Sequence, residues 1–371
     1  MKLSAIDIFH YTLPFIKPLS LMGGGLLTER SGFIIRVQNE HKQIAYGEAA
    51  PFPNLHAESL DTAKHQLLVL KSELIGQDVP DHLDRLEGGF EQWLGKYNLA
   101  PSVRFGIEVA LLNLLGKVHN KSLAALLKPD HRTTVSINAL VSGKSSTIKE
   151  ECERFGREGY KAIKLKVGRG ALEEDIENVR IARESIDRES SEKTIALRLD
   201  ANRAWSLEKA IIFGKAVADI PIEYIEEPVA DPSQHLTFVR ETNIPLALDE
   251  TLTETSTINA LQNLAGIRAF ILKPSVLGSL ERTMQLAHFA QNHAILSVIS
   301  SPFHSSIGRT AEANLAACIN EHDIPIGLDT YRWFQKDLTS TGFHVEKGQI
   351  NLKTVNKNSD NITFDLLQKV G

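Results

Sequence analysis

From about residue 133 the sequence alternates regularly, and this alternation limits the folds open to the chain more than any other feature. Short β-rich runs are mostly followed by amphipathic stretches of helix length, namely 173–186, 206–218, 233–242 and 279–292. The β-rich runs lie at 133–138, 161–166, 195–200, 222–226, 244–248, 268–272, 294–299 and 324–328. Eight strands alternating with helices predict parallel βαβ units, and eight strands close a barrel. A doubly wound open sheet is the competing α/β architecture, but no Gly-rich phosphate turn follows the first strand.

The first third of the chain has a different pattern. Residues 2–13 and 32–38 alternate like strands, and a third strand ends near Gly47 and Glu48. Helical patterning follows at 59–76 and 102–127. Strands followed by helices predict an α+β unit.

The end of the chain carries one more strand-like run, near 343–353, which can return to the first unit. We therefore expect an α+β capping domain over 1–130 and a barrel over 131–332. Residues 333–371 form a C-terminal segment that returns to the cap in this interpretation.

Charge and composition exclude several classes of function. Lys and Arg number 41 against 46 Asp and Glu, a formal net charge of -5, so we expect no nucleic-acid or membrane partner. The two cysteines, Cys152 and Cys318, show neither metal-ligand spacing nor a disulfide framework. The N-terminus lacks the apolar stretch of a signal peptide, and no run is long enough to span a bilayer. We expect a cytoplasmic protein, and the sequence sets no oligomeric state.

Charged residues end several of the predicted barrel strands, at the rim where barrel enzymes carry their active sites. They are Lys164 and Lys166 on the second strand, Asp200 on the third, Glu226 and Glu227 on the fourth, Asp249 on the fifth and Lys273 on the sixth. Taken singly, each can be a solvated strand end or a structural ion pair. As a series they place three carboxylates between two sets of ammonium groups.

That series suits the removal of a proton next to a carboxylate. Three oxygen ligands favour a hard ion such as Mg²⁺, which Mn²⁺ can replace, and a divalent ion stabilises the charge that forms on the substrate carboxylate. A lysine base must be neutral, and a second ammonium beside it lowers its pKa. We interpret Lys166 as the base and Lys164 as its electrostatic partner. Lys273, across the ring, is a second acid–base or a fixed cation.

These stretches resemble the enolase superfamily, specifically its muconate-lactonizing-enzyme subgroup, for which a lysine or histidine base with Mg²⁺ is the known pattern. The resemblance covers nearly the whole chain and implies a TIM-like (β/α)7β barrel with an α+β cap. Its metal ligands fall on Asp200, Glu226 and Asp249, and its catalytic lysines on Lys164, Lys166 and Lys273. Adjacent strand residues point oppositely, so only one of Glu226 and Glu227 can be a ligand.

The same resemblance implies two lid elements in the cap. They are the Gly-rich segment around Gly23, Gly24 and Gly25, and the loop Pro51 to His56. Both would close over the mouth of the barrel.

Within the subgroup the chain is most similar to the o-succinylbenzoate synthase family of menaquinone biosynthesis. The stretches that carry this similarity are 197–205, 273–280, 298–301 and 327–330. The resemblance implies syn-dehydration of a small cyclohexadiene carboxylate, with Lys273 only stabilising charge. It also implies that Ser300, Ser301 and Gly327 line the pocket for the succinyl tail, with Arg198 supporting the site.

Other activities stay open. A dipeptide epimerase or N-succinylamino acid racemase also uses lysines on opposite faces, but epimerases usually carry an Asp-x-Asp element where this chain has the single Asp329. Muconate cycloisomerisation is a third reading, and a non-catalytic binding barrel a distant one. His304 stands where relatives often carry an acid, and we interpret it as a loop anchor in preference to a catalytic acid.

Overall fold

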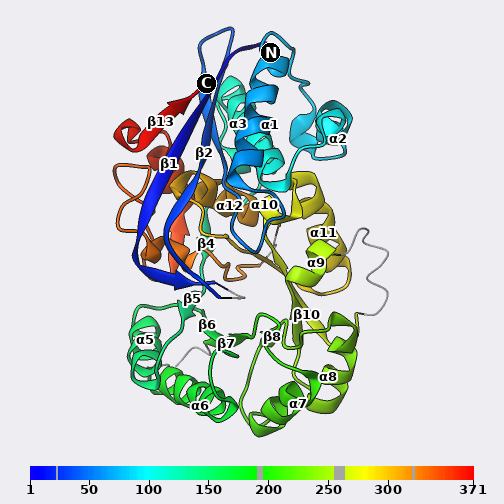
Figure 1. Ribbon diagram of the computed structural model, residues 1–371, viewed down its shortest axis with the longest axis vertical. Helices are drawn as coiled ribbons and strands as arrows, with labels where there is room; N and C mark the ends of the chain where they lie inside the picture. The colour runs from blue at the N-terminus through cyan, green and yellow to red at the C-terminus, as the bar shows by residue number, and fades with distance from the viewer. Residues whose placement is uncertain (22–23, 190–194, 255–263, 320–321) are drawn as a thin grey trace.

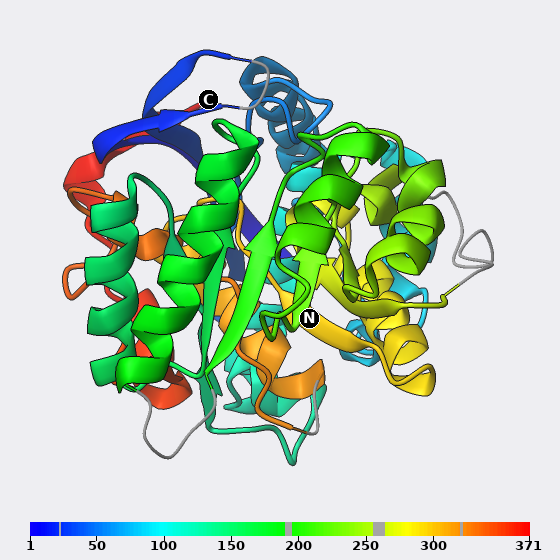
Figure 2. The same ribbon diagram turned by 90° about the horizontal axis from the view of Figure 1, so that it is seen from below.

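The computed structural model describes residues 1–21, 24–189, 195–254, 264–319 and 322–371. An antiparallel sheet with its helices lies at the top of Figure 1, above a parallel sheet wrapped by helices. Figure 2 shows helices surrounding the strands of the lower sheet. The predicted α/β barrel with an α+β cap is therefore confirmed. Met22 and Gly23, in the Gly-rich segment that the sequence suggests as a lid, lie outside the described residues.

The cap is built on four antiparallel strands in the order β13-β1-β2-β3. Their bounds are Leu3–Ser20 for β1, Leu26–Asn39 for β2, Ile44–Ala49 for β3 and Leu367–Val370 for β13. Ile8 pairs with Ile35 on one side and with Val370 on the other. All three predicted N-terminal strands are present, and the first two are longer than predicted because they form one extended hairpin.

Two helices cover the apolar face of this sheet, α1 (Leu60–Leu74) and α3 (Pro101–His119). The helical run predicted over 102–127 is interrupted, because Asn120 adopts a left-handed conformation with φ of 53° and Ser122 caps a separate short helix. A Cβ on Gly47 would lie 2.0 Å from the carbonyl oxygen of Gly106, so α3 crosses β3 where both elements have no side chain. This close crossing fixes the position of the strand end that carries Glu48.

The barrel contains a seven-stranded parallel sheet in the order β11-β10-β9-β8-β7-β6-β5. The strands are β5 Ala139–Val141, β6 Ala162–Lys166, β7 Ala196–Asp200, β8 Tyr224–Glu226, β9 Leu246–Leu248, β10 Ile267–Leu272 and β11 Leu296–Ile299. The predicted eighth strand closes the ring through single bridges, in which Gly327 pairs with Ser300 and Ile326 with Ile137.

The first barrel strand differs from the prediction. Residues 133–138 were expected to form it, but β4 (Thr134–Ser136) pairs antiparallel with β12 (Gln349–Asn351) and β5 takes the barrel position. The prediction that residues 343–353 return to the cap is therefore wrong. The segment that returns is β13, which pairs with the edge of β1.

The remaining elements follow the alternation in the sequence. The other helices are α2 Gly89–Leu94, α4 Leu123–Leu127, α5 Ser145–Arg157, α6 Leu172–Glu189, α7 Leu207–Ala216, α8 His235–Thr242, α9 Glu250–Glu254, α10 Pro274–Leu277, α11 Leu280–Asn292, α12 Ser306–Ile319 and α13 Leu352–Ser359. Short 3-10 turns lie at Leu83–Arg85, Gly95–Tyr97, Pro232–Gln234, Asp329–Trp333 and Phe364–Leu366. All four helices named from periodicity are present.

Both cysteines are buried and free. Burial raises the pKa of each thiol to about 12, so neither is a reactive thiolate at neutral pH. In the part of the chain that the structure describes, no helix combines the length and apolar character needed to cross a membrane.

Candidate active site

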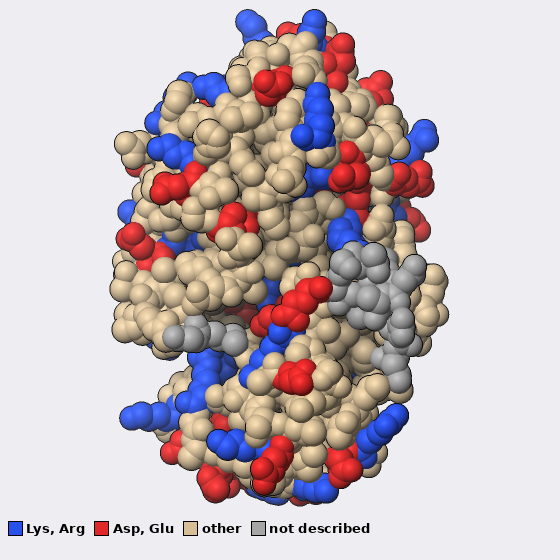
Figure 3. Space-filling view, turned by 45° about the vertical axis from the view of Figure 1, so that its right-hand side comes forward, with Lys and Arg blue, Asp and Glu red and all other residues tan. Residues whose placement is uncertain are grey.

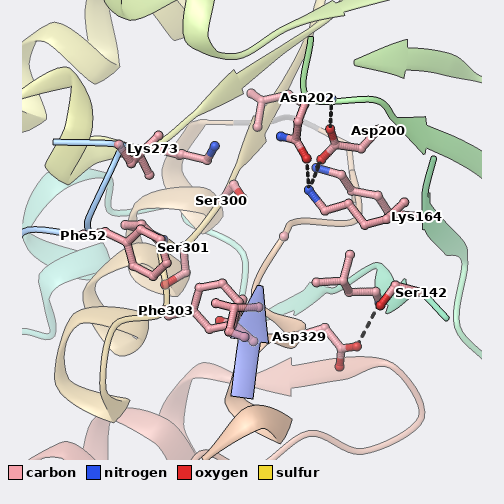
Figure 4. A pocket seen from close by; sticks show the side chains of 18 of the residues that line it. Phe52, Ser142, Lys164, Asp200, Asn202, Lys273, Ser300, Ser301, Phe303 and Asp329 are labelled. Carbon is pink, nitrogen blue, oxygen red and sulfur yellow. Dashed lines mark hydrogen bonds and ion pairs between the residues drawn. The ribbon is translucent and has the colours of Figure 1, made fainter. Parts of the chain in front are cut away.

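A cavity of about 570 Å³ lies at the carboxyl ends of the barrel strands, against loops of the cap. Figure 3 shows acidic and basic side chains gathered where this face of the molecule is hollowed. The lining includes Lys164, Lys166, Asp200 and Lys273, so four of the strand-end charges meet in one space. Figure 4 shows Lys164 and Lys273 on opposite sides of it.

The two lysines of β6 reach the acids of the neighbouring strands. In the parallel register Lys166 lies beside Asp200, and Asp200 lies beside Glu226. The Nζ of Lys164 is 2.7 Å from Asp200 Oδ2 and 2.6 Å from Glu226 Oε2. The Nζ of Lys166 donates to Asp200 Oδ2 at 2.6 Å and to Asn202 Oδ1 at 2.7 Å. Lys166 thus contacts one carboxylate, which it shares with Lys164, and one neutral amide, that of Asn202.

The surroundings of the two lysines shift their pKa values in opposite directions. Burial lowers the pKa of Lys164, but the Asp200 and Glu226 carboxylates together raise it well above the usual value. For Lys166 burial is the largest influence, the Asp200 carboxylate opposes it and the Lys164 ammonium reinforces it, and the net pKa is lowered. One lysine is therefore held charged while the other is moved toward the neutral amine.

Lys273 follows β10 and forms an ion pair with Asp249, which follows β9. Burial lowers the pKa of Lys273, but the surrounding carboxylates, that of Asp249 first, raise it above the ordinary value. This lysine is therefore a fixed cation in the structure.

The adjacent acids Glu226 and Glu227 have separate environments. Glu226 faces Lys164, whereas Glu227 has a left-handed backbone with φ of 42° and turns its fully buried side chain to the next loop. Its Oε1 accepts from the backbone N–H groups of Asp249 and Thr251, each at 2.9 Å. Its Oε2 accepts from Arg203 Nε at 3.0 Å. Glu227 therefore holds the loop that carries Asp249, and only Glu226 of the two contacts a cavity lysine. Glu226 and Asp249 are buried behind the lysines and are not among the residues that line the cavity.

Replacing Glu227 by glutamine is expected to lower the free energy of unfolding by about 2–4 kcal/mol, because the fully buried carboxylate loses its charge-assisted contact with Arg203. Thermal denaturation of the metal-free variant measures this. The matched change Glu254→Gln removes the exposed partner of the same arginine and should cost no more than about 1 kcal/mol. Equal losses in the two variants would contradict the assigned role of Glu227.

The acids near the lysines form a donor set that fits a hard divalent cation. Burial, and then the Asp200 carboxylate, raises the pKa of Glu226 well above its ordinary value, so this cluster favours an added cation or proton. Glu226 Oε1 is buried and has no hydrogen-bond partner among the described residues. In that same part of the chain no three acidic, histidine or cysteine side chains already converge as a metal site. Glu226 and Asp249 instead each form an ion pair with a lysine, Lys164 and Lys273 respectively.

Of the residues expected to bind substrate, Ser300, Ser301 and Gly327 line the cavity. A Cβ on Gly327 would lie 2.7 Å from Ser300 Oγ, so the glycine leaves room for that hydroxyl. Arg198, which the resemblance assigns a supporting role, is not among the lining residues and is 1% exposed. Its guanidinium donates to Glu223 at 2.6 Å and to the Pro325 carbonyl at 2.6 Å.

His304 lies outside the cavity and is fully buried. Its Nδ1 is 2.8 Å from Glu312 Oε1, and its ring stacks on Phe105 with centroids 5.4 Å apart. These contacts are those of a loop anchor, which is the role preferred from the sequence.

Several lining residues were missed from the sequence. Asn202 stands two residues after Asp200, and this spacing was an available signal. Phe303, Lys17 and Arg169 also line the cavity, but no local pattern brings them together. Phe52 lies on the loop Pro51 to His56, which the sequence suggests as a lid element, and four residues of that loop line the cavity.

Comparison with known proteins identifies the family of the chain. Residues 147–356, more than half of the chain, match the family described as enolase C-terminal domain-like. The chain belongs to the enolase superfamily. Residues 3–114 also match the family described as MenC, N-terminal domain. The cap of this superfamily member therefore matches a family model separate from the one that matches the barrel.

Two curated relatives extend the match. The chain is 31% identical to the o-succinylbenzoate synthase of Vibrio cholerae over 341 residues, which cover 89% of this chain and 90% of that protein. It is 32% identical to the protein PHYLLO, chloroplastic, of Arabidopsis thaliana over 83% of this chain, but it spans only 20% of that protein. The similarity to o-succinylbenzoate synthase confirms the prediction that the chain is an enzyme of the carbon–oxygen lyase class.

Solved structures of the enolase superfamily share the fold. The N-succinyl Arg/Lys racemase of Bacillus cereus superposes with a TM-score of 0.82 at 21% identity, covering all of both chains. A dipeptide epimerase of Enterococcus faecalis in complex with Mg and the dipeptide L-Leu-L-Tyr gives a TM-score of 0.81 at 21% identity, over 95% of this chain and 97% of that one.

Proposed function

We propose that the chain catalyses the o-succinylbenzoate synthase reaction, the Mg²⁺-dependent removal of water from 2-succinyl-6-hydroxy-2,4-cyclohexadiene-1-carboxylate. The observation that carries the proposal is the pair of lysines two residues apart on β6, whose surroundings shift their pKa values in opposite directions. The similarity to curated o-succinylbenzoate synthases along nearly their whole length supports the choice of reaction.

Lys166 acts as the base in this proposal. Its amine takes the proton from the ring carbon that bears the carboxylate, because burial and Lys164 favour the neutral form. The resulting ammonium then gives that proton to the hydroxyl group on the same face, which departs as water as the ring becomes aromatic. One lysine therefore serves both halves of a syn elimination.

Lys164 and Lys273 act as fixed cations. Each is held charged by a buried carboxylate, so negative charge that develops on the substrate carboxylate meets an ammonium group from either side. Asp200, Glu226 and Asp249 would hold Mg²⁺, which when bound supplies Lewis-acid stabilisation of that charge. Glu227 and Asn202 keep Asp249 and Lys166 in place.

The rest of the cavity suits a substrate with a second carboxylate. Ser300 and Ser301 line it between the lysines and the cap loops. Lys17 and Arg169 line it as well and supply two further positive charges. A succinyl tail would therefore meet hydroxyl groups along its length and cations at its end.

Asp329 argues against a dipeptide substrate. Its carboxylate accepts from the Leu140 N–H at 2.9 Å and from Arg332 Nη2 at 2.8 Å. Both oxygens are engaged by Arg332, so the carboxylate is not free to bind a substrate ammonium group. A racemase acting on N-succinylamino acids is the second candidate, because Lys166 and Lys273 both line the cavity. Lys164, which lies two residues before Lys166 on β6, is on the side of the cavity opposite Lys273 (Figure 4).

The test is to supply purified protein with the cyclohexadiene substrate and Mg²⁺ and to follow aromatisation by ultraviolet absorbance. We expect rapid turnover that chelation of Mg²⁺ stops. A parallel incubation with N-succinylamino acids in deuterium oxide detects racemase activity as exchange of the α-proton. Exchange without aromatisation would replace the proposed function by the racemase.

A further inference from the structure

Two phenylalanines form the wall of the cavity on the side of the cap. Phe52 lies on the loop after β3 and Phe303 on the loop between β11 and α12, and both line the cavity. Their rings stack with centroids 5.6 Å apart and an interplanar angle of 19°. Figure 4 shows both rings beside Ser301. The wall therefore depends on the relative position of a cap loop and a barrel loop.

Arg30 contacts both of these loops. It lies on β2 of the cap and is 2% exposed. Its Nε donates to the Phe303 carbonyl at 3.1 Å, and its Nη1 donates to the Pro51 carbonyl at 2.7 Å. Its guanidinium carbon also lies 5.3 Å from the centroid of the Phe52 ring. One buried cation thus contacts the backbone of both loops and one of the two rings.

A buried acid holds the same barrel loop further along. Glu48, at the end of β3, is fully buried, and its Oε2 accepts from Ser305 Oγ at 2.6 Å and from the Gly308 N–H at 2.8 Å. Its Oε1 accepts from the Ser305 N–H at 2.9 Å and from the hydroxyl of Tyr11. The start of α12 is therefore held by contacts that Arg30 does not make, whereas Arg30 contacts the backbone of Phe303 itself.

The choice of partners separates Arg30 from an ordinary structural arginine. Its side-chain donors reach the carbonyl group of Phe303, which lines the cavity, and those of Ala50 and Pro51, which directly precede the lining residue Phe52. Arg36, on the same strand, instead forms an ion pair with Asp7 at 2.6 Å, and neither residue lines the cavity. A guanidinium offers several donors in a fixed fork, which one ammonium group cannot reproduce.

We propose that Arg30 is a positioning residue for substrate binding, which holds Phe52 and Phe303 as a rigid aromatic wall against the ring of a cyclic unsaturated carboxylate. This role deepens the proposed function and rests on it. Because buried contacts already hold the two rings in place, little conformational entropy is lost when substrate binds. Disordering of the wall should therefore weaken substrate binding more than it slows the proton transfer at Lys166.

The test compares Arg30→Lys and Arg30→Met with Arg36→Met, the matched control on the same strand. We expect KM for the cyclohexadiene substrate to rise by about 10-fold or more in the Arg30 variants, with kcat within about 3-fold of wild type. The reason is that the wall contacts the substrate equally in the ground state and in the transition state, so its loss weakens the binding of both. Half-activation by Mg²⁺ should not change. Arg36→Met should leave both KM and kcat unaltered.

Arg30→Lys keeps a buried cation and guards against a variant that fails to fold. A double-mutant cycle with Phe303→Leu then asks whether Arg30 acts through the wall, in which case the two effects on KM are clearly less than additive. An unchanged KM, a fall in kcat alone, or additive effects would overturn the role of Arg30. Inactive wild-type protein that also fails to bind o-succinylbenzoate in calorimetry would overturn the proposed function, and the role of Arg30 with it.

Discussion

Replacing Lys166 by alanine is expected to reduce kcat for dehydration by at least about 10³-fold, since general acid–base catalysis contributes about 10²- to 10⁴-fold and this lysine serves both proton transfers. The fold should persist, because Asp200 keeps its contact with Lys164 at 2.7 Å. Ultraviolet assays of aromatisation measure the loss, and circular dichroism measures the fold.

The control is Lys161→Ala, which removes the lysine that immediately precedes β6. Lys161 is 46% exposed and pairs with Asp323, at the other end of the strand from the cavity. This variant should retain wild-type turnover. Mg²⁺ binding, followed by calorimetry, should be kept in both variants. Near-normal turnover in Lys166→Ala would remove this residue from the role of base.

Replacing Asp249 by asparagine is expected to weaken Mg²⁺ binding by more than about 100-fold, since changes that only touch the ligands indirectly already cost about 10- to 100-fold. The effect on stability should be smaller, because the substitution preserves shape and Lys273 still has the carboxylates of Glu250 and Glu226 nearby. Calorimetric titration with Mg²⁺ measures the first quantity, and thermal denaturation without metal measures the second.

The matched control for this change is Asp219→Asn, at an exposed aspartate that pairs with Arg180 at 3.0 Å. It should alter neither Mg²⁺ affinity nor turnover. The metal assignment fails if Asp249→Asn binds Mg²⁺ as the wild type does, or if its loss of affinity is explained by an equal loss of folded protein.

The sequence was sufficient to predict that the strand-end charges lie together, because their positions depend on local rules of strand geometry. Alternation along β6 places Lys164 and Lys166 on one face, and the parallel register then brings them beside Asp200. Periodicity also located the helices around the barrel, since each has one apolar stripe. The roles assigned to these residues remain predictions that the variants above test.

What the sequence did not reveal depends on contacts between distant segments. Arg30 and Phe303 are separated by 273 residues, and no local pattern links them. The left-handed backbone of Glu227 turns its side chain toward the following loop, which strand alternation alone left undecided. The place of β4 was also missed, because a short apolar run does not specify whether its partner is the next strand or the tail.

The sheet of the cap pairs Tyr11 with Leu367, so its edge joins segments from both sides of the barrel sequence. On a ribosome, the first three strands emerge long before the strand that completes their sheet. Until then the edge of β1 exposes unpaired backbone groups, which can recruit other extended chains. We therefore expect the newly made cap to depend on chaperones until translation reaches its final strand, and the assembled molecule to refold slowly because this pairing has a high contact order.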